Sequence, residues 1–236
     1  MRLDNYLFQN FNTQSRNKAQ ELIKNMQVLV DNKVVSKPSF DVNESNKIVI
    51  LNPKQYVSRA GYKLKTYLSE QEFLQVKDLE CLDIGSSTGG FVQVLLEEGA
   101  SKVVAVDIGN AQIHETLKDK KNLEIFEDMD IRKFNYNQKF DLITCDVSFI
   151  GIEHIMDDID RFAKNYIIIL FKPQFEVGYS AKRDKKGVVK DKFSIEIAKK
   201  RFEALANQRW DMVNCVESKL KGKEGNVETF YCFKQR

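Results

Sequence analysis

The sequence predicts an α/β protein in which a doubly wound, mostly parallel sheet follows a small α+β domain. Three observations carry this prediction. Short apolar runs at 79–84 and 102–106 alternate with segments of helical periodicity, as in βαβ units. A loop of small and hydroxylated residues separates the first of these runs from the helix after it. The first fifty residues instead show two short amphipathic helices and brief alternating runs, which indicate a separate module.

Length and charge set the first limits. The chain has 236 residues and a net charge of +3, enough for one ordinary domain plus a small one with a sizeable core. Residues 1–57 carry eight Lys or Arg against five Asp or Glu, and the rest of the chain is balanced. The positive excess therefore belongs to the first quarter.

Cysteines, histidines and hydropathy exclude several classes of protein. The four cysteines lie far apart in apolar runs, which predicts buried free thiols in a reducing compartment. Neither histidine has neighbours that could act as metal ligands, so we predict no metal. The start of the chain is too polar for a signal peptide, and the apolar run at 166–171 is shorter than the roughly 20 residues of a membrane span. We expect a cytoplasmic monomer without integral membrane association.

The first sixty residues begin with a helix at Arg2 and a second helix that Ser15 caps. In the second helix Ala19, Leu22 and Ile23 line one face. Residues 28–30, 34–35 and 47–51 then read as short strands, with a turn at 31–32.

This stretch resembles the S4 RNA-binding domain. The pattern lies in Arg2-Leu3-Asp4, Ser15-Arg16-x-x-Ala19, the segment 28–33 and Lys37-Pro38-Ser39. Asn25 and Asn32-Lys33 stand where that family usually has glycine, a mild departure because asparagine tolerates left-handed angles. The resemblance implies an S4-like domain at 1–51, with six basic residues that face RNA phosphates: Arg2, Arg16, Lys18, Lys24, Lys33 and Lys37. The alternative is that these are the solvated faces of a small α/β cap.

A proline-containing linker is expected at 52–57, followed by a second domain at 58–236. That domain opens with Ser58-Arg59-Ala60-Gly61-Tyr62-Lys63-Leu64, which begins a helix. Arg59 and Lys63 are surface charges on the simplest interpretation.

The glycine loop at 85–90 indicates a cofactor cleft. Glycines at the carboxyl end of a strand let a ligand approach the backbone, and the following helix offers free N–H groups. The spacing Gly85, Gly89, Gly90 lacks the dinucleotide pattern, and Asp107, about twenty residues on, suits ribose hydroxyls. Together these segments look like the S-adenosylmethionine (SAM) site of a Rossmann-like methyltransferase, whose candidate residues are Asp83, Gly85, Ser86, Ser87, Thr88, Gly89, Gly90, Phe91 and Asp107. The alternative is a glycine turn with no ligand.

Three further strands end in polar residues. The run at 122–126 leads to Asp130 and Asp128, our first and second choices for an adenine contact, although a plain polar turn explains them as well. The run at 140–145 delivers Asp146 to the edge where open α/β sheets bind ligands, and Asp146 also suits a helix cap. The run at 166–171 reads as a strand buried on both faces and ends in Lys172.

The remainder predicts a mobile loop at 182–192, a helix at 193–207, and strands at 212–216 and 225–233. A basic loop beside a cleft can grip an RNA backbone, and a solvated linker is the alternative. Four of its residues, together with one from the second domain's first helix, complete the candidate RNA-binding set: Arg59, Lys182, Arg183, Lys185 and Lys186.

The second domain resembles the TlyA family of ribosomal RNA 2′-O-methyltransferases, which are related to FtsJ-like enzymes. The resemblance lies in the motif at 58–64, the glycine loop, Asp146 and the segment 172–178. It implies a catalytic tetrad of Lys63, Asp146, Lys172 and Glu228, with Lys172 as the base. It also implies SAM as cofactor, ribosomal RNA or a ribosomal subunit as partner, and a cytidine 2′-hydroxyl in 16S or 23S RNA as target.

Two other functions remain open at this point. The first is an RNA- or ribosome-binding protein that keeps the fold without catalysis. The second is a membrane-active haemolysin, a label that the family has carried.

Overall fold

The computed structural model describes residues 1–236 except 12, 14, 26, 32, 51–55 and 179–180. The chain forms two compact units, Met1–Gln55 and Tyr56–Arg236. Most of the predicted linker at 52–57 lies outside the described residues. Tyr56 and Val57 belong to the second unit and pack on its apolar cluster, where Tyr56 makes an edge-to-face contact with Tyr62.

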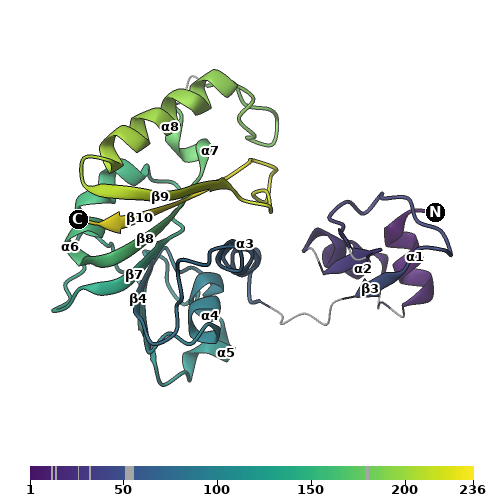
Figure 1. Ribbon diagram of the computed structural model, residues 1–236, viewed down its shortest axis with the longest axis horizontal. Coiled ribbons are helices and arrows are strands. Elements are labelled where there is room, and N and C mark those ends of the chain that lie inside the picture. Colours follow the sequence, from purple (N-terminus) through teal and green to yellow (C-terminus); the bar gives the residue numbers. More distant parts are fainter. Residues whose placement is uncertain (12, 14, 26, 32, 51–55, 179–180) are drawn as a thin grey trace. The chain divides into compact units, whose positions relative to one another are not determined.

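The first unit packs two helices on a small sheet (Figure 1). Its elements are α1 (Leu3–Asn10), α2 (Arg16–Lys24), β1 (Val28–Val30), β2 (Lys33–Val34) and β3 (Ile48–Ile50), and its antiparallel sheet has the order β2-β1-β3. Ser15 caps α2 as predicted, because its side chain accepts the N–H of Lys18. Ala19 and Ile23 are buried with Leu3 and Leu7 of α1, which joins the helices through one apolar core.

The second unit is built on a seven-stranded sheet of order β6-β5-β4-β7-β8-β10-β9. Its strands are β4 (Glu80–Ile84), β5 (Lys102–Val106), β6 (Leu123–Phe126), β7 (Phe140–Cys145), β8 (Ala163–Phe171), β9 (Trp210–Glu217) and β10 (Thr229–Gln235). The five strands from β6 to β8 are parallel, whereas β10 runs antiparallel to both of its neighbours. The predicted fold class is confirmed.

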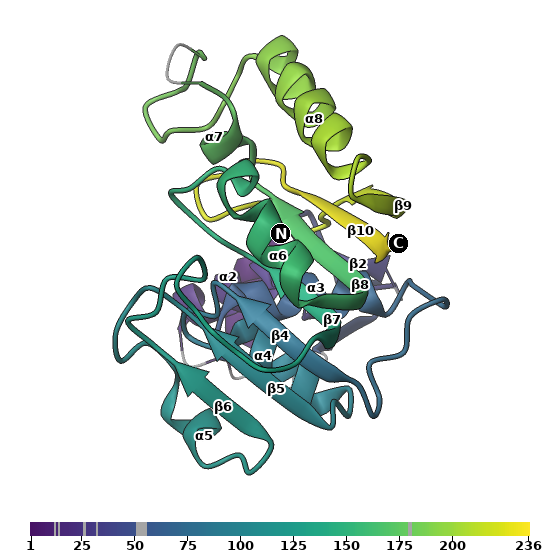
Figure 2. The ribbon, with the colours of Figure 1, turned by 90° about the vertical axis from the view of Figure 1, so that its left-hand side faces the viewer.

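Helices cover both faces of this sheet (Figure 2). One apolar cluster packs α3 (Arg59–Leu68) and α4 (Gly90–Glu97) on one face. The other cluster packs α6 (Met156–Phe162) and α8 (Lys192–Ala206) on the opposite face. Three shorter helices connect these elements: α5 (Glu115–Lys118), the 3-10 helix η1 (Ile152–Ile155) and α7 (Pro173–Glu176).

Strand order locates the ligand crevice. From β4 the chain moves outward to β5 and β6 and then returns to β7 on the other side of β4. In open α/β sheets, ligands bind outside the carboxyl ends of the strands at such a reversal. The crevice is therefore expected beyond Ile84 and Cys145, the last residues of β4 and β7.

Candidate active site

Strand register gathers the ends of four elements at one edge of the sheet. Ile84 of β4 pairs with Cys145 of β7, and Thr229 of β10 pairs with Phe171 of β8. The loop after β4 and the residue after β7 consequently meet there. Glu228, which precedes β10, and Lys172, which follows β8, reach the same edge because the two strands are antiparallel.

The loop between β4 and α4 lets the chain after β7 approach its backbone closely. Gly85 has φ +81°, and a Cβ at this position would lie 3.1 Å from the backbone of Asp146 and of Val147. Ser87 also has a positive φ of 45° and donates its N–H to the Asp107 carboxylate at 2.8 Å. Asp107 accepts a second bond from the Gly109 N–H at 2.7 Å. This carboxylate therefore ties the glycine loop to the segment after β5.

A cavity of about 540 Å³ opens between these segments. Of the predicted cofactor residues, Gly85, Ser87, Asp107 and Asp130 line it. The lining continues through residues that the sequence did not single out, including Ile108, Gln112, Met129, Ser148 and Phe149. The cavity has the size of a small-molecule site, which typically spans roughly 300–1,000 Å³.

Asp83 lies directly beneath this loop and is fully buried. Its Oδ1 accepts the Thr144 hydroxyl at 2.6 Å, and its Oδ2 has no hydrogen-bond partner among the described residues. Burial raises the pKa of Asp83 to about 8. The Ser86 hydroxyl is buried without a described partner as well. Buried polar atoms of this kind are uncommon in folded proteins and mark places where a ligand can supply the missing bond.

Gly90 and Phe91 have packing roles, and their predicted contact with the cofactor stays a prediction. A Cβ on Gly90 would lie 2.1 Å from the Ser58 hydroxyl and 2.8 Å from the Gly61 backbone nitrogen, so this glycine lets α4 pack against α3. The Phe91 ring is buried and stacks with Phe230. Gly89 similarly faces Leu117, whose Cδ1 would lie 2.4 Å from an added Cβ.

Asp130 and Asp128, the two candidates for an adenine contact, lie in different surroundings. Asp130 lines the cavity, and the Arg132 guanidinium beside it lowers the pKa of its carboxyl to about 2. Asp128 is exposed, accepts the Asn110 side chain at 2.6 Å and is not among the lining residues. Thr88 likewise does not line the cavity; its carbonyl accepts the His114 N–H.

Lys172 is held at the cavity's edge by two hydrogen bonds and one ionic contact. Its Nζ lies 2.9 Å from Asp146 Oδ1, and it donates to the Asp146 carbonyl at 3.2 Å and to the Ser148 hydroxyl at 2.8 Å. The suggestion that Asp146 caps the next helix is wrong, because η1 begins only at Ile152 and Asp146 faces Lys172 instead.

Lys63 and Glu228 form the second buried pair. Lys63 Nζ lies 2.5 Å from Glu228 Oε2, and the two residues are 8 % and 2 % exposed. Gly222 closes over this pair, since a Cβ there would lie 2.6 Å from Glu228 Oε1. The four predicted tetrad residues thus form two lysine–carboxylate pairs from four separate parts of the second unit.

Phe149 is the most prominent residue that the sequence interpretation missed. It is 92 % exposed, has φ +67°, lines the cavity and contacts the Phe175 ring at 5.1 Å between centroids. Its segment is braced by Glu176, which accepts the Ile152 N–H at 3.1 Å. An exposed aromatic ring beside a cleft is the side chain on which a nucleic-acid base stacks. A single Phe in a loop gives no periodic signal, so only the structure reveals it.

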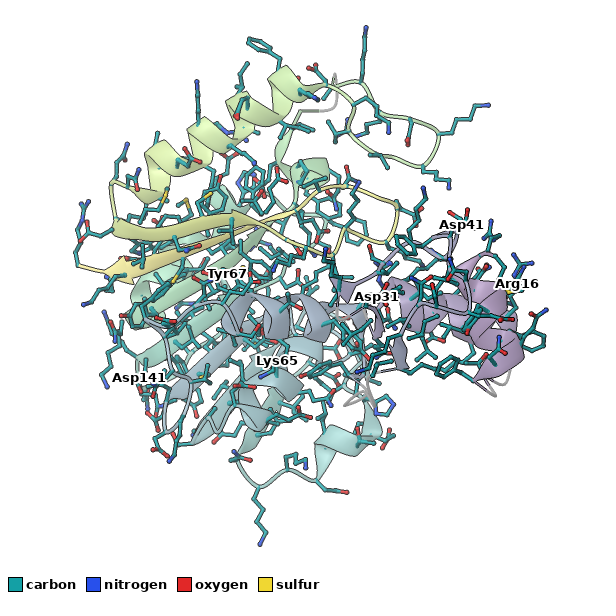
Figure 3. All side chains as sticks on the ribbon, turned by 45° about the vertical axis from the view of Figure 1, so that its right-hand side comes forward. Arg16, Asp31, Asp41, Lys65, Tyr67 and Asp141 are labelled. Carbon is teal, nitrogen blue, oxygen red and sulfur yellow. The ribbon has the colours of Figure 1, made fainter. Side chains whose placement is uncertain are left out.

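Basic residues of the first unit differ in their surroundings. Arg2 and Arg16 both bind the buried Asp4 carboxylate, and Lys18 pairs with Glu21. The remaining three candidates are exposed: Lys24, Lys33 and Lys37. Figure 3 shows Arg16 on α2.

The basic candidates for RNA binding in the second unit also differ in their surroundings. Arg183 donates to the carbonyls of Gln174, Val177 and Ala181, so it fastens the loop to the segment that precedes it. Its predicted contact with RNA stays a prediction. Arg59 donates to the Lys221 carbonyl at 3.1 Å. The other predicted residues of this loop are exposed: Lys182, Lys185 and Lys186. An isolated bridge between Arg183 and Val189 gives the loop a short hairpin form.

The cysteines differ in burial. Cys81, Cys145 and Cys232 are buried free thiols, but the prediction for Cys215 is wrong because it lies exposed on β9, the edge strand. The described residues contain no group of three or more His, Cys, Asp or Glu that could hold a metal ion. Within the same residues, no helix is both long and apolar enough to cross a membrane.

Both units of the chain match known proteins. Residues 56–235 match the FtsJ-like methyltransferase family, and residues 1–48 match the S4 domain. A Campylobacter jejuni protein named 23S rRNA (cytidine-2′-O)-methyltransferase TlyA is 47 % identical over 99 % of both chains. A Mycobacterium tuberculosis protein named 16S/23S rRNA (cytidine-2′-O)-methyltransferase TlyA is 32 % identical over 97 % of this chain and 88 % of its own. A solved Streptococcus thermophilus structure described as a hemolysin has a TM-score of 0.71 and 26 % identity, covering 100 % of this chain and 88 % of that one.

Proposed function

The chain belongs to the TlyA family of S4-domain, FtsJ-like methyltransferases, and on that premise we propose that it methylates the 2′-hydroxyl of a cytidine in ribosomal RNA with SAM as methyl donor. The observation that carries this proposal is the presence of two lysine–carboxylate pairs, Lys63–Glu228 and Lys172–Asp146, at the sheet edge where Asp146 lines the cavity. Relatives with whole-chain similarity carry names for this reaction.

The cavity residues fit SAM. Asp107 lines the cavity and retains acceptor capacity for ribose hydroxyls beside the two backbone N–H groups that it already accepts. Ile108 and Met129 add apolar surface for a flat base. When bound, SAM supplies an electrophilic methyl group. Gly85, Ser87, Asp107 and Asp130 are the residues we assign to holding it.

Lys172 is the proposed base. A ribose hydroxyl is a poor nucleophile at neutral pH, so a positioned group must take its proton as it attacks. An ammonium donates three hydrogen bonds, and Lys172 donates two of them, to the Asp146 carbonyl and the Ser148 hydroxyl, while its Nζ also lies 2.9 Å from Asp146 Oδ1. After loss of one proton, two N–H groups still hold Asp146 and Ser148, and the lone pair is available to the ribose hydroxyl. Asp146 would thereby orient the amine.

Lys63 and Glu228 are proposed to orient the hydroxyl. Their side chains reach the edge that carries Lys172 from a different direction, since Lys63 lies on α3 and Glu228 precedes β10. A fixed donor and acceptor at this position restrict the hydroxyl to one orientation. Alignment of reacting atoms is a large source of rate enhancement in two-substrate reactions.

The first unit is proposed to bind ribosomal RNA or an assembled subunit through its basic residues, in a chain that acts as a cytoplasmic monomer. A protein that binds RNA without catalysis is the second candidate. The buried Lys63–Glu228 pair speaks against it, because burying an ion pair is often no more stabilising than apolar residues and so suggests a functional reason.

The test combines binding and transfer. Calorimetry measures SAM binding to the full chain, and tritium transfer from SAM is followed on purified 16S and 23S RNA and on both ribosomal subunits. We expect label on RNA, mapped to a cytidine 2′-O-methyl group. SAM binding without label on any of these substrates would favour the non-catalytic candidate, and absence of SAM binding would contradict the cofactor assignment.

A further inference from the structure

Two segments of the second unit are joined to each other at the edge of the cavity. One is 146–152, which follows β7 and leads into η1, and the other is 172–176, which follows β8 and contains the short helix α7 (Figure 2). Lys172 fastens their first ends, because its Nζ donates to the Ser148 hydroxyl at 2.8 Å and lies 2.9 Å from Asp146 Oδ1. The surroundings of the proposed base therefore depend on where the 146–152 segment lies.

The far ends of the two segments are fastened by Glu176, the last residue of α7. Its Oε1 accepts the N–H of Ile152, the first residue of η1, at 3.1 Å, and Glu176 is 6 % exposed. Its Oε2 would lie 3.6 Å from a Cβ on Gly151, so the carboxyl group packs directly on this backbone. Between the two ends, the rings of Phe149 and Phe175 are 5.1 Å apart. Side chains of α7 thus hold the segment at its middle and at its end.

The helix α7 sets the position of Glu176 relative to Lys172. Pro173 occupies the first turn, where its restricted φ suits a helix. The N–H of Phe175 donates to the Lys172 carbonyl at 3.0 Å, and the N–H of Val177 donates to the Pro173 carbonyl at 3.0 Å. Glu176 therefore lies one turn of helix after the proposed base, with the backbone between them fixed by hydrogen bonds.

A carboxyl group is unfavourable to bury at this position. Burial raises the pKa of Glu176 to about 7, although the N–H of Ile152 and the charge of Arg201 act in the opposite direction. Arg201 of α8 donates to the main-chain carbonyl of Glu176 at 3.1 Å, and its Nε lies 3.3 Å from Glu153 Oε2. The charge of Glu153 also disfavours ionisation of Glu176. Strongly perturbed carboxyl groups of this kind cluster at functional sites.

We propose that Glu176 is a positioning residue for methyl transfer, which keeps the 146–152 segment where it orients the Lys172 amine. This inference rests on the proposed function, in which Lys172 is the base, and deepens it. Glu176 does not belong to the described lining of the cavity, so its effect passes through the segment that it holds. The competing explanation is that Glu176 only completes the hydrogen bonds of η1 and stabilises the fold.

The experiment measures single-turnover methyl transfer by the full chain, at saturating SAM and with the ribosomal RNA or subunit that the wild type labels, also at saturation. SAM affinity is measured by calorimetry, and thermal unfolding is followed in parallel. Glu176→Met keeps a side chain of similar length but removes the acceptor, whereas Glu176→Gln keeps an acceptor oxygen without the charge. Glu153→Met is the matched control, because Glu153 is a neighbouring acid beside the same Arg201, with a side chain that is 34 % exposed.

We expect Glu176→Met to bind SAM as the wild type does, because the residues assigned to holding SAM lie on other segments. Its single-turnover rate should fall by roughly 10- to 100-fold, the scale expected when a catalytic group is misplaced by about 1 Å. Glu176→Gln should recover most of the rate, since its amide oxygen can accept the Ile152 N–H. Glu153→Met should transfer methyl groups at the wild-type rate. A role in folding alone predicts no loss of rate in a folded variant at saturation.

Several results would overturn the inference. One is a folded Glu176→Met variant with the wild-type rate; another is a Glu176→Gln variant as slow as Glu176→Met. A loss confined to SAM affinity, with an unchanged rate at saturation, would also contradict it. If Glu176→Met does not fold, Glu176→Asp tests the same bond, because a side chain shorter by one methylene withdraws the carboxylate from Ile152, and a full rate there would count against the proposal. A wild-type protein that binds SAM and RNA but transfers no label would instead contradict the proposed function itself.

Discussion

Lys63→Met should destabilise the second unit far more than Lys65→Met, a substitution two residues away on the same helix. Lys63 pairs with Glu228, which is 2 % exposed. Removing one partner leaves an uncompensated buried charge, at a cost of about 3 to 5 kcal/mol. Lys65 pairs with Glu98, but these side chains are 41 % and 32 % exposed, and such surface pairs contribute about 0.2 to 1 kcal/mol. Figure 3 labels Lys65 on α3.

The assay is urea unfolding at pH 7 followed by tryptophan fluorescence. Trp210 is the chain's single tryptophan and is buried in the second unit, so its signal reports on that unit alone. A Lys63→Met/Glu228→Gln double variant should recover most of the lost stability, because no unpaired charge remains, yet should not recover methyl transfer. Equal free energies of unfolding for the Lys63 and Lys65 variants, or an active double variant, would refute the reasoning.

Three further results are expected. Gly90→Ala should lower the unfolding free energy by about 1 to 3 kcal/mol in urea titrations, because its Cβ would lie 2.8 Å from the Gly61 backbone nitrogen; unchanged stability would contradict this packing role. Phe149→Ala should leave stability within about 0.5 kcal/mol, because the ring is exposed, while RNA affinity falls by roughly 5- to 150-fold if a base stacks there; unaltered affinity would count against stacking. The free energy of unfolding of the wild type should fall as pH rises from about 4 to about 8, because burial raises the pKa of Asp83 and the folded chain retains a proton that the unfolded chain loses. Asp83→Asn should show a smaller decline over this pH range. Parallel pH profiles of the two proteins would contradict this prediction.

The strands of the sheet were largely predictable because their signal is local. The run at 140–145 coincides with β7, and 102–106 coincides with β5. A strand buried on both faces is continuously apolar and is bounded by polar residues, so its ends are visible in the sequence. Asp146 and Lys172 each follow such a run directly, and the carboxyl ends of parallel strands share one edge of the sheet. Their placement at that edge therefore follows from local pattern alone.

Residues with long-range packing roles could not be assigned in this way. Gly90 belongs to a glycine-rich sequence that is typical of a ligand-binding loop. Its role next to Ser58 depends on how α3 packs against α4, which the local sequence does not show. The sequence around Arg183 suggests a phosphate contact, and only the structure shows that its guanidinium donates to carbonyls of the segment before its loop. Cys215 has apolar neighbours in the sequence, which favoured a buried thiol. It lies on β9, an edge strand, and its side chain is exposed to solvent.

Tritium transfer from SAM to ribosomal RNA by Lys172→Ala, compared with Lys164→Ala, tests whether Lys172 is the base. Both lysines belong to or adjoin β8, but Lys164 lies near its start and pairs with Asp141, with a side chain that is 62 % exposed. The account predicts that Lys172→Ala binds SAM and RNA yet transfers no label, while Lys164→Ala transfers as the wild type does. Full methyl transfer by Lys172→Ala would contradict it.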